Sequence, residues 1–283
     1  MGKRHSVIRF IKNLVKRVFE DRVFDLAAQL AYFFLLSLFP FLIFTFGVLP
    51  YIGIDQTDVL AFISHYAPPE LMDIIRDNLK GVFDQHAGLL SFSVIATIWP
   101  TSTAIMAIIR VLNQAYGVRE SRSFIVARGM AILLTFALIF VILIALLLNV
   151  FGPSIGRLLV VQYGTPPDII KVFDFLRLAL SFIIIILVFA CLYLFAPNKR
   201  LKISEVLLGA IFAAVGWQLA SYAFSYYVDQ TVHFSATYGT LGGIIVLLIW
   251  FYLTGFILIL GGEINALLYQ YRKTNRYSRI SRR

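Results

Sequence analysis

The segment from Trp250 to Lys273 reads WFYLTGFILILGGEINALLYQYRK, and it decides the fold class. It belongs to an apolar run over 240–268, and an α-helix needs roughly 20 apolar residues to cross a hydrocarbon core about 30 Å thick. Glu263 is the one carboxylate of this run, placed between a glycine pair and Asn265. The segment therefore predicts a transmembrane helix whose last turns carry polar groups.

The whole chain shares this apolar character. Of its 283 residues 60% are hydrophobic and 14% are charged, with a mean hydropathy of +0.84, whereas soluble domains carry about 25% charged residues. We predict an all-α, polytopic membrane protein with one integral domain over 1–283. Its parts are a cytoplasmic interfacial segment over 1–25, a six-helix membrane region over 26–268 and a basic cytoplasmic tail over 269–283. The six predicted spans are 26–53, 89–110, 128–151, 174–196, 203–228 and 240–268.

Two further amphipathic helices are predicted at the surfaces of the membrane. Residues 5–19, HSVIRFIKNLVKRVF, place apolar side chains at helical spacing among basic ones, which is typical of a helix lying in the interface. Between the first two spans, Pro68 and Pro69 open a stretch with one apolar face. We expect an N-terminal interfacial helix and an outer helical cap.

The distribution of charge predicts the orientation. Segments 1–25, 110–128, 197–202 and 270–283 hold 20 of the 25 Lys and Arg residues, and basic residues concentrate on the cytoplasmic side. Both termini are therefore expected to be cytoplasmic in a bacterial inner membrane. The formal net charge of +10 is explained by orientation and by attraction to anionic headgroups, about 1 kcal/mol per basic residue. Nucleic acid is not an expected partner.

Polar residues and prolines recur at intermediate depth in four spans. Pro40 and Pro100 lie near the middle of the first two spans, and a proline costs about 3 kcal/mol in a helix interior. One interpretation is that these residues line a substrate path built on kinked helices. The other is that the hydroxyl side chains among them form hydrogen bonds with the backbone carbonyls that the prolines leave unpaired. The candidate path residues are Ser37, Pro40, Pro100, Thr101, Ser102, Gln218 and Thr254.

A second group of candidates lies at the inner ends of the spans. Glu263 is near a helix C-terminus, where the helix dipole disfavours a negative charge, so we predict that it pairs with Arg110. The candidates for an inner gate and for headgroup binding are Asp25, Arg110, Asn113, Glu263 and Asn265. Close helix packing is predicted at Gly239 and Gly243, which have Gly-x-x-x-Gly spacing, and at Gly261 and Gly262.

Motifs for common enzymatic chemistry are missing from the sequence. It has no G-x-x-x-x-G-K-[ST], no G-x-S-x-G and no H-E-x-x-H pattern. The single cysteine, Cys191, lies within a span, and the four histidines are scattered. No catalytic residue, cofactor or metal site is predicted, although an outer site built from histidines stays as an alternative.

Four segments resemble the YihY/BrkB family of bacterial inner-membrane proteins. They are DLAAQLAYFFLLSLFPFLIF, IWPTSTAIMAIIRVLNQAYGVRESRSF, GAIFAAVGWQLASYAFSYYV and YGTLGGIIVLLIWFYLTGFILILGGEINA. The resemblance implies six membrane helices and no established biochemical activity. Members have carried a ribonuclease name regarded as a misassignment; others are linked by name to virulence, and lipid or glycolipid movement has been suggested. The family's characteristic positions fall on Asp25, Pro40, Arg110, Asn113, Tyr116, Arg122, Trp217, Tyr238, Gly239, Trp250, Gly262, Glu263 and Asn265.

These patterns favour a transporter or scramblase-like protein for a lipid or another amphipathic substrate, without its own ATPase. Its expected partners are membrane lipids, with anionic headgroups at the cytoplasmic face, and a homo-oligomer stays open. The alternatives are an ion-coupled carrier for a small solute and a structural or regulatory subunit of an envelope complex. A membrane ribonuclease ranks last because the inner carboxylates form no metal-binding pattern.

Overall fold

The computed structural model describes residues 2–48, 60, 87–138, 140, 167–230 and 240–280. The chain divides into two units, one of residues 1–32 with 105–283 and the other of residues 33–104. Throughout these described ranges the regular structure is α-helical, without strands. The predicted all-α fold is confirmed.

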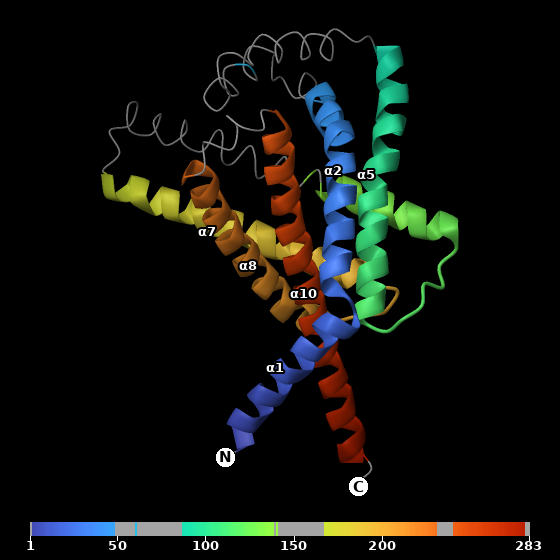
Figure 1. The fold of residues 1–283 in the computed structure, drawn as a ribbon, viewed down its shortest axis with the longest axis vertical. Coiled ribbons are helices and arrows are strands. Elements are labelled where there is room, and N and C mark those ends of the chain that lie inside the picture. Colours follow the sequence, from blue (N-terminus) through green and yellow to red (C-terminus); the bar gives the residue numbers. More distant parts are fainter. Residues whose placement is uncertain are drawn as a thin grey trace. The chain divides into compact units, whose positions relative to one another are not determined.

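The helices follow the apolar runs of the sequence closely (Figure 1). They are α1 (Gly2–Glu20), α2 (Val23–Val48), α5 (Ala87–Ala115), α7 (Pro167–Phe195), α8 (Ile203–Gln230) and α10 (Thr240–Ile280). A further apolar helix covers Phe124–Leu138. The last helix differs most from expectation, because α10 continues past residue 268 through most of the basic tail as one helix of 41 residues.

Three of the described helices are long and apolar enough to cross a membrane, over Lys171–Phe195, Ile203–Phe224 and Gly243–Lys273. They match the last three predicted spans. The shorter apolar helices Val23–Leu38 and Phe124–Leu138 match the start of the first and third predicted spans. The predicted outer cap, and the end of the third span, lie outside the described residues.

Within the first unit, α8 packs against both α7 and α10, and α1 packs against α10. Much of α7 stays exposed: Phe175, Leu178 and Ile183 all have more than half of their surface open. Such side chains suit a helix that faces lipid. Burial concentrates at the other end of α7, where Leu192 and Tyr193 lie in the core.

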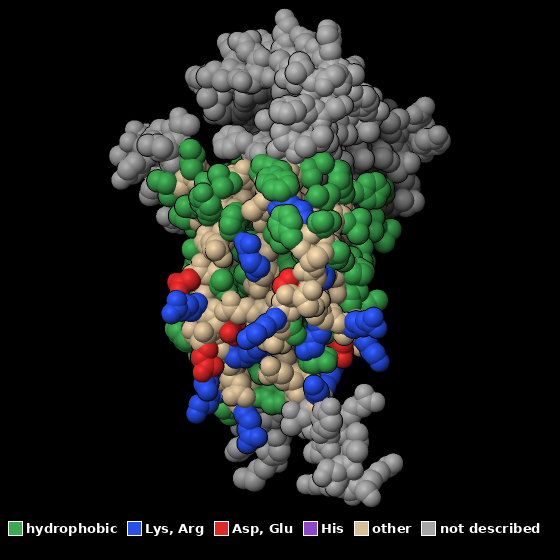
Figure 2. Space-filling model, turned by 90° about the vertical axis from the view of Figure 1, so that its right-hand side faces the viewer, with side chains coloured by type: hydrophobic (Ala, Val, Ile, Leu, Met, Phe, Trp, Pro, Cys, Tyr) green, Lys and Arg blue, Asp and Glu red, His purple; other side chains and the backbone are tan. Residues whose placement is uncertain are grey.

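Charged side chains gather in one zone of the molecular surface, below a band in which hydrophobic side chains prevail (Figure 2). Hydrogen bonds tie the basic segments together within the first unit: Gln114 Nε2 donates to the Asp21 carbonyl, Arg122 Nη2 to the Ala196 carbonyl and Arg272 Nη1 to the Ser204 carbonyl. We call the helix ends and loops joined by these bonds, near Asp21, Gln114, Arg122, Ala196, Ser204 and Arg272, the charged end. Basic segments far apart in the sequence thus meet at the same helix ends.

Candidate functional site at the charged end

Glu263 lies at the centre of the charged end. Its side chain is 1% exposed, and its Oε2 atom lies 3.2 Å from Nε of Arg17 on α1. The same Nε lies 3.8 Å from Oδ2 of Asp21, and Arg17 Nη2 donates a 2.6 Å hydrogen bond to the carbonyl of Ala115 at the end of α5. One guanidinium therefore connects α1, α5 and α10.

The predicted partner of Glu263 was the wrong arginine. The structure places Arg17 against this carboxylate, whereas Arg110, the expected partner, has an exposed side chain on α5. Asp25 is also exposed, in the first turn of α2, where the helix dipole stabilises a negative charge. Arg17 is an equally basic residue on the N-terminal helix, so the ion pair joins the two ends of the chain rather than two spans.

Asn265, one of the predicted gate residues, holds α8 against α10. Its side chain is fully buried; Oδ1 accepts a 2.7 Å hydrogen bond from the Gly209 backbone N–H, and Nδ2 donates at 2.9 Å to the Val206 carbonyl. Both ends of the amide are therefore used by the backbone of one neighbouring helix. This arrangement supports a packing role.

Glycines permit this close approach. A Cβ atom at Gly209 would collide with the Gly261 carbonyl and with Asn265, and one at Gly261 would lie 2.8 Å from the Gly209 carbonyl. Gly262 is equally tight, because its Cβ would lie 2.5 Å from a methyl of Leu112. At Gly261 and Gly262, where close packing is predicted from the sequence, a side chain would therefore meet neighbouring helices.

The other predicted packing pair is not supported. Gly243 is exposed, and a Cβ there would meet nothing within 4 Å among the described residues. Its predicted partner, Gly239, lies outside the described residues. The tight crossing of α8 and α10 thus lies near the charged end, at a glycine of α8 that no Gly-x-x-x-Gly pattern marks.

A polar network joins the two loops of the charged end. Asn113 Nδ2 donates to Glu120 Oε2 at 2.8 Å, and its Oδ1 accepts from the Asn198 N–H at 2.6 Å. Arg122 Nε donates to Glu120 Oε1 at 2.9 Å. Asn198 Nδ2 donates to Ser121 Oγ at 2.7 Å. The loop after α5 is thereby fixed to the loop between α7 and α8.

The acid of this network is stabilised in its charged form. Burial raises the pKa of Glu120, but hydrogen bonds from Arg122 and Asn113 outweigh burial and hold that pKa below its usual value. Glu120 is therefore ionised at neutral pH, and it compensates part of the local positive charge.

Beside this network lies a pocket of about 570 Å³. Its lining combines apolar and basic side chains. Its lining residues are Arg122, Met130, Leu194, Phe195, Pro197, Asn198, Lys199, Arg200 and Leu201. Such a pocket can hold an anionic group and an apolar chain together.

Lys199 of the pocket lies over two aromatic rings. Its Nζ lies 3.9 Å from the ring centroid of Tyr269 and 5.4 Å from that of Tyr116. Burial, together with repulsion from Lys273, lowers the pKa of the Lys199 ammonium, and attraction to Glu205 only partly opposes this. A bound anion would relieve the repulsion.

The predicted polar layer is only partly described. Ser37 and Ser102 donate to carbonyls within their own helices, at Phe34 and Trp99, as expected if hydroxyls satisfy local backbone groups. Both helices continue through Pro40 and Pro100. The side chains of Pro40 and Thr101 lie outside the described residues.

The layer's other two residues are on α8 and α10. Gln218 has an exposed side chain on α8. Thr254 accepts a 3.2 Å hydrogen bond from Trp217 Nε1, and Trp250 Nε1 donates to Ser221 Oγ at 3.3 Å. The two indole rings also meet edge to face, 5.9 Å apart. These contacts join the two helices in both directions.

Four residues of the charged end were missed by sequence reasoning: Arg17, Glu120, Tyr193 and Asn198. Arg17 could have been found, because it shares one face of the N-terminal helix with Phe10, Asn13 and Leu14. Tyr193, which is fully buried and donates to the Leu258 carbonyl at 2.7 Å, carries no signal within its uniformly apolar run.

Comparison with known proteins gives the family of this chain. A model for the family described as virulence factor BrkB matches residues 14–282. The chain belongs to the BrkB family. The identification agrees with the resemblance seen in the four quoted segments. It also agrees with the predicted class of bacterial membrane protein.

Relatives of this BrkB-family protein cover nearly all of the chain. YfkH of Bacillus subtilis, named a ribonuclease-like protein, is 46% identical over 265 residues, which are 93% of this chain and 96% of the relative. A UPF0761 membrane protein of Aeromonas salmonicida is 26% identical over 281 residues, 95% of this chain and 92% of the relative. One of Aliivibrio fischeri is 29% identical over 276 residues, 93% and 83% respectively. No solved structure matches.

Metal-dependent chemistry finds no support in the described ranges of this BrkB-family protein. There, no group of three or more His, Cys, Asp and Glu side chains could hold a metal ion. The histidines of the alternative outer site, His65, His86 and His233, carry no description in the structure.

Proposed function

We propose that this BrkB-family protein binds and moves an amphipathic substrate, a lipid with a negatively charged headgroup, without its own nucleotide hydrolysis. The observation that carries the proposal is the pocket at the charged end, where three basic side chains adjoin an apolar wall. Neither a soluble anion nor a plain hydrocarbon would use both parts. An amphipathic molecule uses both.

The chemistry of the pocket favours a negative headgroup. Lys199 and Arg200 come from the short loop between α7 and α8, and Arg122 comes from the loop after α5. Arg122 is already engaged by Glu120 and the Ala196 carbonyl. Lys199 and Arg200 are thus the cations that a headgroup would attract, while Leu194 and Phe195 offer an apolar surface to its chain.

The pocket also lies at a suitable depth along its helices. Its residues Leu194 and Phe195 end the membrane-spanning segment of α7, and the basic loop follows directly. Headgroups lie at this level of a bilayer, where the apolar core gives way to water. A lipid could therefore enter the pocket directly from the bilayer, without first passing into water.

A liposome assay tests the proposal. The purified protein is reconstituted with fluorescently labelled phosphatidylglycerol or phosphatidylcholine, and the fraction of label accessible to a membrane-impermeant quencher is followed over time. We expect faster transfer of the anionic lipid between leaflets than in empty liposomes. The double variant Lys199→Gln, Arg200→Gln should lose most of the preference for the anionic lipid.

Lys202→Gln is the matched control, because Lys202 lies in the same loop but does not line the pocket. It should transfer lipid as the unmodified protein does. Rates equal to those of empty liposomes for both lipids would contradict the proposal. An equal effect of Lys202→Gln and of the double variant would also contradict it, because only the net charge of the loop would then matter.

A further inference from the structure

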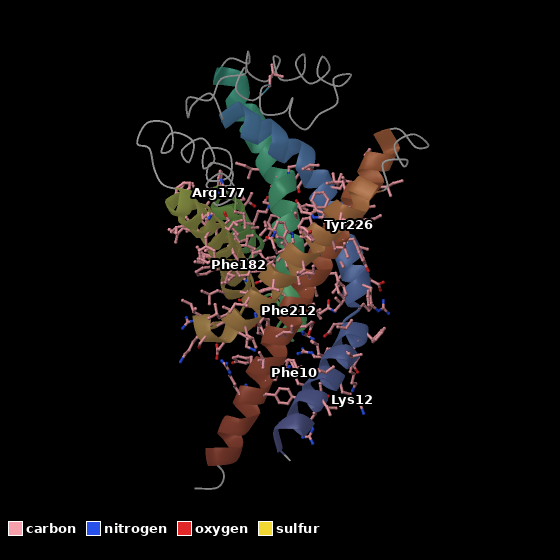
Figure 3. All side chains as sticks on the ribbon, turned by 90° about the vertical axis from the view of Figure 1, so that its left-hand side faces the viewer. Phe10, Lys12, Arg177, Phe182, Phe212 and Tyr226 are labelled. Carbon is pink, nitrogen blue, oxygen red and sulfur yellow. The ribbon has the colours of Figure 1, made fainter. Side chains whose placement is uncertain are left out.

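The N-terminal helix α1 has two faces of different chemistry. Phe10, Asn13, Leu14, Arg17 and Val18 are buried or half-buried, and they recur at the spacing of one helix face. Figure 3 shows Phe10 on the side of α1 that faces α10, and Lys12 on the opposite side. The outward face consists of exposed side chains.

The inward face of α1 is fastened by specific polar contacts. Asn13 Nδ2 donates to the Tyr271 hydroxyl at 2.6 Å, and the Phe10 and Tyr271 rings lie 6.3 Å apart. One turn further on, Arg17 reaches Glu263 and the Ala115 carbonyl. These contacts hold α1 against α10 along two turns.

The fastening is incomplete at its centre. Arg17 Nη1 and Glu263 Oε2 are both buried without a hydrogen-bond partner in the described structure. Groups of this kind lower the net gain from burying an ion pair. Docking of α1 against α10 is therefore held by few strong contacts, and a modest external contribution would change its equilibrium.

The outward face of α1 offers such a contribution. It exposes Ile8, Ile11, Val15 and Phe19, each with at least half of its surface open. Lys12 and Lys16 are exposed beside this stripe, and Arg9 follows on the same flank. An apolar stripe with a basic flank matches a membrane surface that contains anionic lipid.

We propose that α1 is a lipid-responsive latch: its outward face binds the anionic surface of the surrounding bilayer, and this binding stabilises the ion pair between Arg17 and Glu263. In the docked position the inward face of α1 contacts α10 while its outward face contacts the bilayer, so lipid that binds the outward stripe favours docking. By linkage, anionic lipid and the buried ion pair stabilise each other. The inference holds whatever the protein transports.

Thiol labelling tests the latch. Val18 is buried on the inward face, so a cysteine introduced there is protected while α1 is docked. Val18→Cys is made together with Cys191→Ala, so that the introduced thiol is the only one in the chain. Its reaction with a neutral, water-soluble maleimide is timed in nanodiscs of phosphatidylglycerol and of phosphatidylcholine. We expect labelling to be about tenfold slower in the anionic lipid.

The outward face and the ion pair are then varied separately. Ile11→Gln with Val15→Gln should make the labelling rates in the two lipids equal. Glu263→Gln should speed labelling in both lipids. Arg119→Cys, an exposed loop position outside α1, is the control for lipid effects on the reagent, and its rate should not follow the lipid. Leu14→Cys, half-buried on the same inward face, is the second reporter if Val18→Cys fails to fold.

Two results would overturn the proposal. Equal labelling of the introduced thiol in both lipids would show that the bilayer does not influence α1. Protection that rises with the number of protein copies per nanodisc, whatever the lipid, would identify a second copy of the chain as the occupant of the stripe.

Discussion

Arg17 connects three helices of the charged end, α1, α5 and α10. It reaches two carboxylates and one carbonyl, while its side chain is only 15% exposed. A buried ion pair contributes little net stability compared with apolar packing, but breaking it leaves an uncompensated charge. The asymmetry between these two effects makes the pair testable.

Arg17→Gln should lower the free energy of unfolding by about 3–5 kcal/mol, because it leaves Glu263 buried without its counter-charge. The double variant Arg17→Gln, Glu263→Gln should recover a large part of that loss. Thermal unfolding in detergent, followed by size-exclusion chromatography, measures both. Arg110→Gln serves as control and should cost much less; a loss as large as that of Arg17→Gln would restore Arg110 as the important partner.

At the scale of helices, α8 and α10 cross closely because Gly209 and Gly261 have no side chains. Gly209→Ala should destabilise the protein by about 1–3 kcal/mol or force the two helices apart, because its Cβ would meet backbone and a buried amide. Gly243→Ala, on α10, adds the same methyl group where nothing lies within 4 Å. It should leave the unfolding temperature unchanged, and equal effects of the two substitutions would contradict the described crossing.

Helices were predictable from the sequence, whereas their contacts were not. A run of apolar residues predicts a span by length alone, so α7, α8 and α10 were found, and the start of α8 was placed at its observed residue. The crossing point depends on which small residues face each other. Gly209 has no glycine four residues away in its own span. Its role in packing is apparent only from the structure, where Gly261 of α10 lies opposite it.

At the scale of the whole molecule, the two loops of the charged end are joined through Glu120. A lowered pKa means that its contribution to stability is fully present above the usual pKa and is lost as the pH falls through the lowered value. Glu120→Gln should therefore destabilise the protein by about 1 kcal/mol at pH 7. The difference should shrink below about pH 4. Unfolding temperatures measured across this pH range check the prediction, and a constant difference would contradict it.

The charge pattern of the sequence predicts which segments lie on the same side of the membrane, but not which side chains pair. Their alternation along the sequence predicted that they share one side of the membrane, and in the first unit they do meet at the same helix ends. Which side is cytoplasmic stays a prediction from the positive-inside rule. The pairing of Glu263 with Arg17 was not predicted, because several basic residues of the N-terminal helix carry the same charge. The one distinguishing signal is the helix face that Arg17 shares with Phe10 and Leu14.

The edge-to-face contact of Trp217 and Trp250 also gives the protein a built-in optical reporter. Two of its three tryptophans lie 5.9 Å apart on different helices, and the third, Trp99, belongs to the other unit. Indole transitions at such a distance couple, so the near-ultraviolet circular dichroism contains a component that depends on the separation of α8 and α10. Movement between these two helices can thus be followed in the unlabelled protein, in any lipid, by spectroscopy alone.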